Sequence, residues 1–512
     1  MVRVRFAPSP TGPLHIGGLR TALYDYLLAK QQGGKFILRI EDTDQKRYVE
    51  GAEQYVIDAL RWMGIEPDEG PGIGGDYGPY RQSERADLYQ KYVQQLLDGG
   101  HAYYAFDTTE ELDAMRRRKE AEGIIAQKYD ASIRLEMKNS LSLSKEEVQQ
   151  HLDKNVNVTV RMKIIPGELI SFRDIVRDKV EFKSEELDDK IIMKATGLPT
   201  YHMANVVDDK YMKISHVIRG EEWLSSTAHH VLLYRALGWE SHIPQFAHIP
   251  LLLKPVGKGK LGKRDGAKFG FPVFPKNWNT GEEVYEGLQE YGILPEAAMN
   301  FLAFLGWNPG TDEEILSEAE LIKQFSLERV NKSGARFDIE KGKWYNQQYI
   351  ISKPNEELAD LIRPLISEAG YEPTAEFLSS FCGLMKERVE LLPEFLSQGR
   401  FFFEPPTAYD DKTAKKKYKA ENHEHFLAIQ TLIEGLEDFS GKSIQTAVKQ
   451  YIQSNELGFG AILPILRIVI TGSMQGPDIF ETIALIGRSE ATNRITAGLA
   501  YISQLYKSQD HA

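Results

Sequence analysis

The beginning of the chain alternates between strand and helix patterns, and this alternation constrains the fold more than any other feature. Apolar and charged side chains alternate over residues 2–7, as in a strand, and residues 19–27 carry apolar side chains at helical spacing. Residues 36–40 form a second, apolar strand pattern, and residues 52–63 form a second helical stripe that Gly64 ends. Strand, helix, strand and helix joined by short turns predict a parallel sheet covered by helices, which is the α/β fold class.

Further along, the alternation is interrupted and then resumes. Residues 101–196 lack it, and we expect an inserted α+β domain there. The insertion shows two helix patterns and two antiparallel strand patterns, at 110–123, 144–153, 156–160 and 181–182. A strand pattern at 214–218 and a helix pattern at 226–237, with serine at its start, then follow. After about Asn331 the strand signals fade, so the remainder is predicted to be helical.

The composition sets broad limits on function. The chain has 512 residues, 42% apolar and 27% charged, which is an ordinary globular profile for roughly three or four domains. No apolar stretch approaches the ~18 residues of a membrane span, and the chain opens directly into a strand pattern, so we expect no membrane contact and no signal peptide. The net charge of −12 argues weakly against nucleic-acid binding, unless basic side chains gather on one face. The single cysteine, Cys382, is predicted to be a buried thiol in a reducing compartment, the cytoplasm.

The most informative string is FAPSPTGPLHIGG, residues 6–18, which lies between the first strand and the first helix. In a doubly wound sheet this is the carboxyl end of a strand, where ligands bind. Prolines fix the loop, glycines admit a ligand to the backbone, and we expect the start of the helix to offer free N–H groups to phosphate. His15 is placed to donate to a phosphate chain. The alternative is a turn rich in proline and glycine with a structural histidine.

A basic, glycine-rich segment forms the second informative string. Between Lys254 and Lys268 there are six lysine or arginine residues and one aspartate, a local net charge of +5. A loop of this kind suits stabilisation of a transferring phosphate, where charge develops in the transition state. The alternative is a solvated basic loop without a ligand. The two strings lie about 245 residues apart and flank the interrupted α/β domain.

The first string resembles the HIGH motif of class I aminoacyl-tRNA synthetases, and the second resembles their KMSKS motif. Five further collinear strings narrow the resemblance to the glutamyl-tRNA synthetase family. They are RIEDTD (39–44), DEGP (68–71), GPYRQSER (78–85), YHMANVVDD (201–209) and VIRGEEW (217–223). With the helical C-terminal part, the resemblance covers essentially the whole chain.

The resemblance implies a domain order and a reaction. The catalytic domain would be of Rossmann type in two halves, followed by a loop and stem-contact region and by all-α anticodon-binding domains, with the insertion holding the tRNA acceptor end. The expected boundaries are 1–100, 101–196, 197–254, 255–330 and 331–512. The implied reaction is ATP-dependent ligation of L-glutamate to the 3′ end of tRNA(Glu) through a glutamyl-adenylate, with release of AMP and pyrophosphate. Members of this family typically require bound tRNA before they activate the amino acid.

Site residues follow from the same resemblance, position by position. The expected glutamate pocket is Arg5, Ser9, Glu41, Tyr201, Asn205 and Arg219. The expected ATP-binding residues are Ser9, Pro10, His15, Gly17, Trp223, Lys260, Lys263 and Arg264. His15, Lys260 and Lys263 would be catalytic, Arg467 and Thr471 would contact tRNA near the anticodon, and Mg²⁺ would be bound through the ATP phosphates. A monomer is expected.

Each of these residues also has a plain structural interpretation. The alternating pattern alone favours Arg3 and Arg5 on the solvent face of an edge strand. Residues 41–44 resemble a turn with a helix cap, and Tyr201, Asn205 and Trp223 could be core or interface residues. A metal site at His229, His230, His242 and His248 is disfavoured because the ligand spacing is irregular.

The chain departs from the family pattern in three places. Gly18 ends the first motif, where glutamyl enzymes often lack the last histidine, and Gly262 replaces the usual serine of the second motif. Some relatives carry a cysteine-based zinc site in the insertion, but residues 103–106 here are Tyr-Tyr-Ala-Phe, so no zinc is expected.

Two rival functions remain open in the sequence. A truncated-type paralogue that modifies a tRNA base would lack the residues after Asn331, and a non-catalytic regulatory paralogue is favoured only by Gly262. The sequence leaves undecided whether tRNA(Gln) is also charged.

Overall fold

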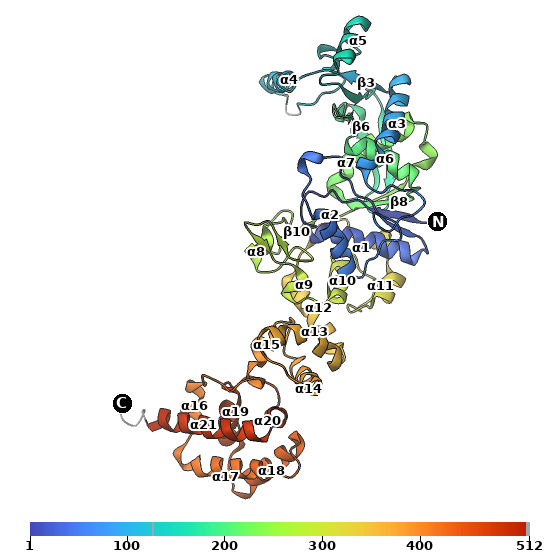
Figure 1. The fold of residues 1–512 in the computed structure, drawn as a ribbon. Coiled ribbons are helices and arrows are strands. Elements are labelled where there is room, and N and C mark those ends of the chain that lie inside the picture. The colour runs from blue at the N-terminus through green and yellow to red at the C-terminus, as the bar shows by residue number, and fades with distance from the viewer. Residues whose placement is uncertain (125–126, 508–512) are drawn as a thin grey trace. The chain divides into compact units, whose positions relative to one another are not determined.

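The computed structural model describes residues 1–124 and 127–507 (Figure 1). The chain divides into two compact units. Residues 1–290 and 298–339 form the first unit, and residues 291–297 and 340–512 form the second. All strands in the described part of the chain belong to the first unit, and the second unit is helical.

The first unit is organised around parallel strands. β1 (Arg3–Phe6) and β2 (Lys35–Leu38) pair in parallel, and the backbone amide of Ser215, just before β8 (His216–Gly220), donates to the carbonyl of Arg3. β8 also pairs in parallel with β9 (Gln245–Ile249). The hairpin of β5 (Leu169–Asp174) and β6 (Asp178–Lys183) extends this mixed sheet in the order β6-β5-β9-β8. The predicted α/β fold is confirmed.

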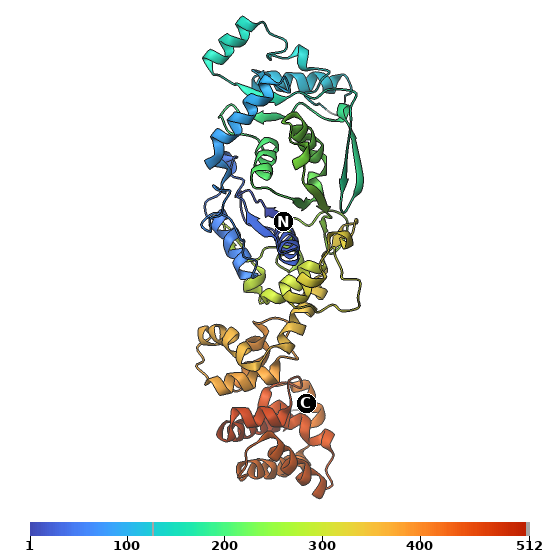
Figure 2. The same ribbon diagram turned by 90° about the vertical axis from the view of Figure 1, so that its right-hand side faces the viewer.

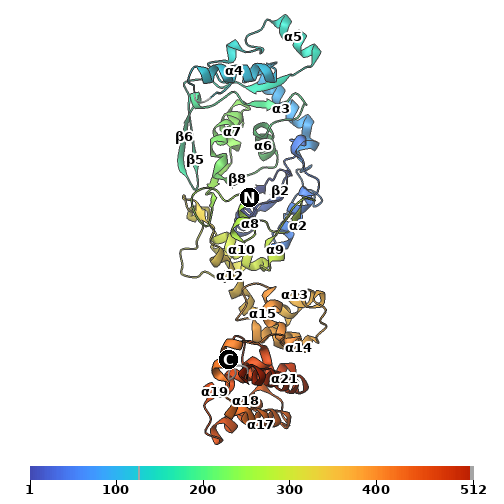
Figure 3. The same ribbon diagram turned by 90° about the vertical axis from the view of Figure 1, so that its left-hand side faces the viewer.

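Helices cover these strands. α1 (Ile16–Gln31) connects β1 to β2, and α2 (Ala52–Trp62) follows β2. α6 (Tyr201–Tyr211) and α7 (Leu224–Ala236) lie side by side next to the sheet, and the β5–β6 hairpin runs along α7 (Figures 2 and 3). The helix predicted to begin at Ser226 begins at Leu224 instead, because a single 3₁₀ turn, Glu221–Trp223, leads directly into it.

The insertion forms a separate small sheet with helices beside it. β3 (Ala102–Ala105), β4 (Thr159–Met162) and β7 (Ile191–Met193) are antiparallel, and α3 (Ala86–Asp98) leads into β3.

The predicted helices of the insertion are α4 (Thr109–Ala121) and α5 (Lys145–Lys154), and each begins with a capping box. The strand expected at 156–160 begins only at Thr159. Asn155 and Asn157 have φ of 48° and 57°, a left-handed backbone that is incompatible with a strand.

Short elements follow between β9 and residue 339, where residues 291–297 belong to the second unit and the others to the first. They are β10 (Leu252–Leu253), α8 (Asp265–Phe269), β11 (Trp278–Asn279), β12 (Val284–Tyr285), α9 (Leu288–Tyr291), α10 (Pro295–Phe304), α11 (Glu318–Gln324) and β13 (Ala335–Arg336). β13 pairs with β10, so this two-residue strand is an exception to the all-helical expectation for residues 331–512.

The second unit is built from amphipathic helices. They are α12 (Ile339–Ser352), α13 (Asn355–Glu368), α14 (Ala375–Met385), α15 (Glu394–Gly399), α16 (Asp411–Lys417), α17 (His423–Glu434), α18 (Gly441–Ser454), α19 (Phe459–Thr471), α20 (Ile479–Ile486) and α21 (Arg488–Lys507). Ile444, Val448 and Ile452 of α18 recur every four residues and enter one core with α16, α17 and α19–α21. Cys382 of α14 is fully buried as predicted, and burial raises the pKa of its thiol to about 12.

The expectation that Arg3 and Arg5 lie on the solvent face of an edge strand is wrong. Their exposed fractions are 7% and 3%. β1 has β2 on one side and the start of β8 on the other, so it is not an edge. Both guanidinium groups find buried carboxylates, Arg3 at Glu69 (2.7 Å) and Arg5 at Asp209 (3.0 Å), and these ion pairs make an arginine tolerable inside the fold.

Candidate active site

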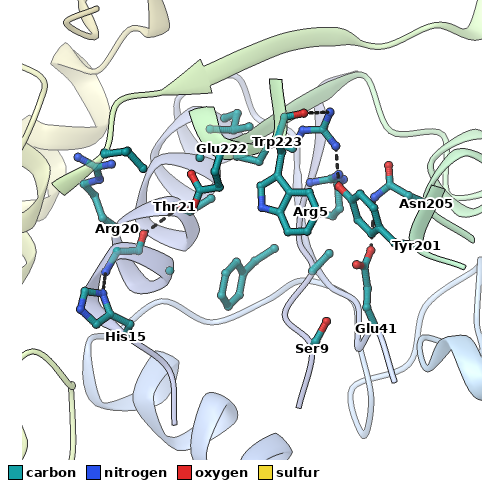
Figure 4. A pocket seen from close by; sticks show the side chains of 18 of the residues that line it. Arg5, Ser9, His15, Arg20, Thr21, Glu41, Tyr201, Asn205, Glu222 and Trp223 are labelled. Atoms are coloured by element: carbon teal, nitrogen blue, oxygen red, sulfur yellow. Dashed lines mark hydrogen bonds between the residues drawn. The ribbon is translucent and has the colours of Figure 1, made fainter. Parts of the chain in front are cut away.

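A cavity of about 530 Å³ opens where β1, β2 and β8 end and where α1 and α6 begin. Figure 4 shows its two ends. His15, Arg20 and Thr21 lie at one end, Arg5, Glu41, Tyr201 and Asn205 lie at the other, and Glu222 and Trp223 lie between them. Among the predicted site residues, Arg5, Ser9, His15, Gly17, Glu41, Tyr201, Asn205, Arg219, Trp223 and Lys260 line this cavity.

A network of buried charges supports one end of the cavity. Asp209, near the end of α6, receives Arg5 Nε at 3.0 Å and Arg39 Nη1 at 2.7 Å, and Arg39 Nη2 also donates to Glu41 Oε1 at 3.1 Å. Burial acts to raise the pKa of Asp209, but the two guanidinium groups outweigh it and hold that pKa below its usual value. Burial raises the pKa of Glu41, although Arg39 and Arg5 oppose the shift.

The Asn205 amide completes this network. It is best satisfied when its nitrogen faces Asp209 at 3.2 Å and its oxygen accepts from Arg39 at 3.1 Å and from Arg5 at 3.2 Å. Asn205 therefore links the two arginines and Asp209 through buried hydrogen bonds. No described residue donates to Glu41 Oε2, which leaves this oxygen available to a cationic group in the cavity.

Arg219, at the end of β8, brings a positive charge to the same end. Its exposed fraction is 6%, and its Nη1 donates to the Tyr201 hydroxyl at 2.6 Å. Nε donates to His248 at 3.1 Å, and Nη2 donates to Thr227 at 2.7 Å. Arg219 and Glu41 therefore present opposite charges to one cavity. This arrangement suits a ligand that carries both an acidic and an ammonium group.

His15 marks the other end. It is the N-cap of α1, and its Nδ1 accepts from the Gly17 amide at 3.0 Å. The proton of the neutral ring is therefore on Nε2, a buried atom without a hydrogen-bond partner among the described residues. Burial, followed by the charges of Lys260 and Lys263, lowers the pKa of His15 to about 4. The ring thus offers one neutral N–H donor.

The start of α1 differs from the expectation in one respect. Free backbone N–H groups were expected there, but the amides of Ile16, Gly17, Gly18 and Leu19 all donate within the protein, the first to Val273 and the other three to His15. A phosphate at this end would therefore meet mainly side-chain donors.

Lys260 and Lys263 reach this region in different ways. Residues 252–261 form a tight hairpin in which Leu261 donates to Leu252, and Lys260 Nζ lies 2.7 Å from Glu222. A Cβ placed on Gly12 would lie 3.4 Å from Lys263 Nζ, so Lys263 contacts the proline-rich loop. Burial lowers the pKa of Lys263.

Three predicted nucleotide-binding residues do not line the cavity. They are Pro10, Lys263 and Arg264. Pro10 is buried, and its carbonyl accepts from the Val49 amide. Arg264 is exposed just before α8.

The cavity also has lining residues that were not predicted. They include Arg20, Thr21, Thr43, Asp44, Arg47, Gln82, Lys194 and Glu222. Thr43, Asp44 and Glu222 lie inside strings that the sequence had already singled out. Lys194 carries no such signal, because it enters from the end of β7 in the insertion, where its Nζ donates to the Thr43 carbonyl at 2.9 Å.

The two predicted tRNA contacts lie on and beside α19 in the second unit. Arg467 is half-buried, and its Nη1 donates to the Pro477 carbonyl at 2.7 Å. The Thr471 hydroxyl lies 2.9 Å from the carbonyls of Arg467 and Ser473 and stabilises the end of the helix. Arg467 has further N–H donors for an incoming ligand, whereas the single hydroxyl proton of Thr471 is used within the protein.

The histidines considered as metal ligands do not form a cluster. Within residues 1–124 and 127–507, no group of three or more His, Cys, Asp or Glu side chains is arranged to hold a metal ion. His229 and His230 are buried in α7, His248 pairs with Asp174, and His242 is exposed. In that same part of the chain, no helix is both long enough and apolar enough to cross a membrane.

Comparison with known proteins adds independent findings. A family model described as "tRNA synthetases class I (E and Q), catalytic domain" matches residues 1–344, and one described as "Anticodon binding domain" matches residues 357–499. The chain is 52% identical over 498 residues to a protein from Phocaeicola vulgatus named glutamate–tRNA ligase, covering 96% of this chain and 97% of that one. A protein of the same name from Christiangramia forsetii is 51% identical over 496 residues, covering 96% and 98%. The crystal structure of a glutamate tRNA ligase from Elizabethkingia meningosepticum in complex with its amino acid matches with a TM-score of 0.94 and 46% identity, covering 98% of this chain and 99% of that one.

Proposed function

Because this chain belongs to the class I tRNA synthetases of the glutamate and glutamine type, we propose that it uses ATP to join L-glutamate to the 3′ end of tRNA(Glu). The use of ATP is a property of the class. The choice of glutamate is supported by one observation above all, the opposite charges of Arg219 and Glu41 in a single cavity.

In this proposal glutamate occupies the end of the cavity next to the buried charges. Its side-chain carboxylate accepts from Arg219 and Tyr201, and its ammonium group is held by Glu41 Oε2. Arg39 holds Glu41 Oε1, Arg5 and Asn205 hold Asp209, and Ser9 lies on the loop opposite. The α-carboxylate then points toward the middle of the cavity, where Trp223 lies. Holding reactants in this way removes entropy from the reaction step.

ATP occupies the remaining length of the cavity, toward His15. An oxygen of the glutamate α-carboxylate attacks the α-phosphorus, forming the acyl phosphate bond while the bond to the pyrophosphate oxygen breaks. A ribose hydroxyl at the tRNA 3′ end then attacks the activated carbonyl carbon, and AMP leaves. The Nε2–H of His15 and the ammonium groups of Lys260 and Lys263 would stabilise the charge that develops on the phosphates. Gly17, Pro10 and Arg264 would shape and flank the nucleotide site.

Mg²⁺ would accompany ATP in this reaction. Its preferred ligands are oxygens, and it commonly keeps the phosphates of a substrate in its coordination shell. The described cavity residues offer few carboxylates at the phosphate end, with Glu222 already paired to Lys260, and this fits an ion carried mainly by the nucleotide. The ion would neutralise phosphate charge.

tRNA would contact regions beyond the cavity. We propose that the insertion, residues 101–196, holds the acceptor end and that residues 255–330 contact the stem. Residues 331–512 would read the anticodon, with Arg467 among the contacts. We propose that the enzyme acts as a monomer. Charging of tRNA supplies translation, and we therefore place the enzyme in the cytoplasm.

The direct test is charging of purified tRNA with radiolabelled glutamate and ATP, comparing tRNA(Glu) with tRNA(Gln). Labelled tRNA(Glu) supports the proposal, and label on tRNA(Gln) as well would broaden its specificity. No label on either tRNA, with tRNA binding intact, would contradict it in favour of a regulatory tRNA-binding protein. Gly262 would then be the first residue to replace by serine. Its amide donates to Asp265 at 2.7 Å, and a Cβ at this position would meet only Asp265 Oδ2, at 3.4 Å, so the loop has room for the side chain.

A further inference from the structure

Arg219 makes more hydrogen bonds inside the protein than a residue reserved for substrate would make. Nε donates to His248 at 3.1 Å, and Nη1 donates to the Tyr201 hydroxyl at 2.6 Å. Nη2 donates to the Thr227 hydroxyl at 2.7 Å and to the Trp223 carbonyl at 3.4 Å. A guanidinium group has five N–H donors, so one donor on Nη1 is left for a ligand. The side chain is thereby fixed in plane and in rotation.

The acceptor of the Arg219 Nε hydrogen bond is His248, which is held in one tautomer. His248 Nδ1 lies 2.6 Å from Asp174 Oδ2, and both side chains are fully buried. A carboxylate can only accept, so Nδ1 carries the proton and Nε2 presents a lone pair to Arg219. Asp174 is itself fixed by the amides of Val176 (2.9 Å) and Arg177 (2.8 Å). Burial acts to raise the pKa of Asp174, but His248 and the backbone amides outweigh it and keep that pKa low, as a carboxylate requires.

The hydrogen bonds of Arg219 also determine which donor groups face the ligand. Thr227 accepts from Arg219 Nη2, and its Oγ1 lies 3.1 Å from His248 Nε2, so it packs against both partners of the Arg219–His248 bond. Tyr201 accepts from Arg219 Nη1, so its hydroxyl proton points away from Arg219 toward the cavity. At its side-chain end, the ligand therefore meets two donors, Nη1–H and the Tyr201 hydroxyl, beside the positive charge of Arg219. A carboxylate satisfies both donors, whereas the –NH₂ of a carboxamide would face a donor without an acceptor.

We propose that the Asp174–His248 pair is the positioning device for the choice of glutamate over glutamine, because it holds Arg219 in the orientation in which Arg219 and Tyr201 present only donors. This inference rests on the proposed function and deepens it. His248 and Asp174 touch no substrate, and they act through Arg219. His248 lies on β9, which pairs with the strand β8 that carries Arg219, and Asp174 lies on the next strand, β5. The lone pair of His248 Nε2 is the feature on which the choice of glutamate over glutamine depends.

Three variants of the full-length enzyme separate positioning from a merely structural role. His248→Phe removes the acceptor for Arg219 Nε, and His248→Gln restores an oxygen near the position of Nε2. Asp174→Asn keeps an oxygen for the amides of Val176 and Arg177, but its –NH₂ donates to Nδ1 and drives the His248 proton onto Nε2, against Arg219. His242→Phe is the matched control, because His242 is exposed and its side chain hydrogen-bonds only to Ser241 among the described residues.

The measurement is steady-state charging of tRNA(Glu) with glutamate and, separately, with glutamine, together with the melting temperature of each variant. We expect the KM for glutamate to rise about tenfold or more in His248→Phe and Asp174→Asn, since a buried donor loses its acceptor. In the same two variants, we expect the KM for ATP to stay within about twofold of the wild type and the use of glutamine relative to glutamate to rise. We expect His248→Gln to recover most of the affinity for glutamate and His242→Phe to match the wild type.

Two results would overturn the inference. In the first, a folded His248→Phe or Asp174→Asn enzyme has the KM for glutamate of the wild type and the same ratio of glutamine to glutamate charging as the wild type. The other is a loss in His248→Gln as large as in His248→Phe, which would assign His248 to packing. A wild-type enzyme that charges no glutamate would remove the proposed function and this inference together, and that outcome is distinct from both.

Discussion

The two ends of the cavity are built in opposite ways. At the glutamate end, Arg5, Arg39 and Asp209 have exposed fractions of 3%, 0% and 2%, and these three charges are paired with one another before any ligand arrives. At the phosphate end, the side chains of Lys260 and Glu222 are 56% and 40% exposed and pair with one another. The first end is formed in advance by folding. In our proposal, the second end exchanges this surface ion pair for phosphate contacts when the nucleotide binds.

This difference has an energetic meaning. A buried ion pair is costly to desolvate and becomes strongly destabilising when one partner is removed, so changes at the glutamate end should reduce stability as well as function. An exposed ion pair contributes about 0–1 kcal/mol, so changes at the phosphate end should spare stability and reduce the rate. Four experiments can break or sharpen this contrast.

The largest effect is expected from Asp209→Asn. The substitution keeps the shape of the side chain but removes the negative charge between Arg5 and Arg39, and leaving charges buried without a partner costs about 3–5 kcal/mol. The free energy of unfolding, measured by denaturant titration, should fall by that amount. Asp58→Asn is the control, because the Asp58–Arg61 pair is on the surface and its loss should cost less than about 1 kcal/mol. Equal losses in the two variants would remove the contrast.

Arg219→Ala should give the next largest effect, on catalysis. It removes the positive charge opposite the glutamate side chain, and we expect kcat/KM for glutamate to fall by roughly 10²–10³ with tRNA affinity nearly unchanged. Charging kinetics and a tRNA filter-binding assay measure the two quantities. Arg235→Ala is the matched control, since Arg235 pairs with Glu168 at the surface. Normal glutamate charging by Arg219→Ala would mean that the glutamate pocket is misplaced.

Lys260→Ala probes the exposed end. Loss of a cation that stabilises phosphate charge should lower kcat by about tenfold to a hundredfold. The KM for glutamate and the unfolding free energy should change little, because the Lys260–Glu222 pair is exposed. Lys258→Ala, two residues earlier in the same loop, serves as the control. A fall in stability comparable to that of Asp209→Asn would show that both ends are prebuilt.

His15 presents its Nε2–H at the phosphate end, and replacing this residue should give the smallest effect. Its folded pKa of about 4 lies below the ordinary value of 6.5, so the unfolded chain binds a proton that the folded chain refuses between these values. Stability from this group is therefore complete above pH 6.5 and is lost as the pH falls toward 4. Between pH 7 and pH 5 the wild type should lose roughly 1–2 kcal/mol more than His15→Asn, which keeps an oxygen for the Gly17 amide. Parallel pH profiles of unfolding for the two proteins would refute the assignment.

The sequence was sufficient for elements with strong local signals. The strand and helix patterns of residues 2–63 predicted β1, α1, β2 and α2, and the helix patterns at 110–123 and 144–153 predicted α4 and α5. His15 was found in a string between a strand and a helix, whereas Arg219 and Glu41 were found through the resemblance of their strings to a known family, and the structure brings all three to one cavity. Their roles stay predictions until they are tested.

Other features were beyond reach of the sequence because they depend on distant contacts. Burial of Arg3 and Arg5 requires Glu69 and Asp209, and nothing local distinguishes a paired buried arginine from a solvated one. The Asp174–His248 pair spans 74 positions, so each partner appeared as an isolated polar residue. The satisfied amides at the start of α1 depend partly on the Val273 carbonyl, far along the chain.

The most direct test of the contrast between the two ends is a pair of crystal structures, one with glutamate and one with glutamate and a non-hydrolysable ATP analogue. We predict that Arg5, Arg39, Asp209, Arg219 and Tyr201 keep their positions when glutamate binds, with the side-chain carboxylate against Arg219 Nη1 and the Tyr201 hydroxyl. We also predict that the nucleotide separates Lys260 from Glu222. Rearrangement of the buried charges around glutamate, or a Lys260–Glu222 pair that persists beside bound nucleotide, would contradict the account.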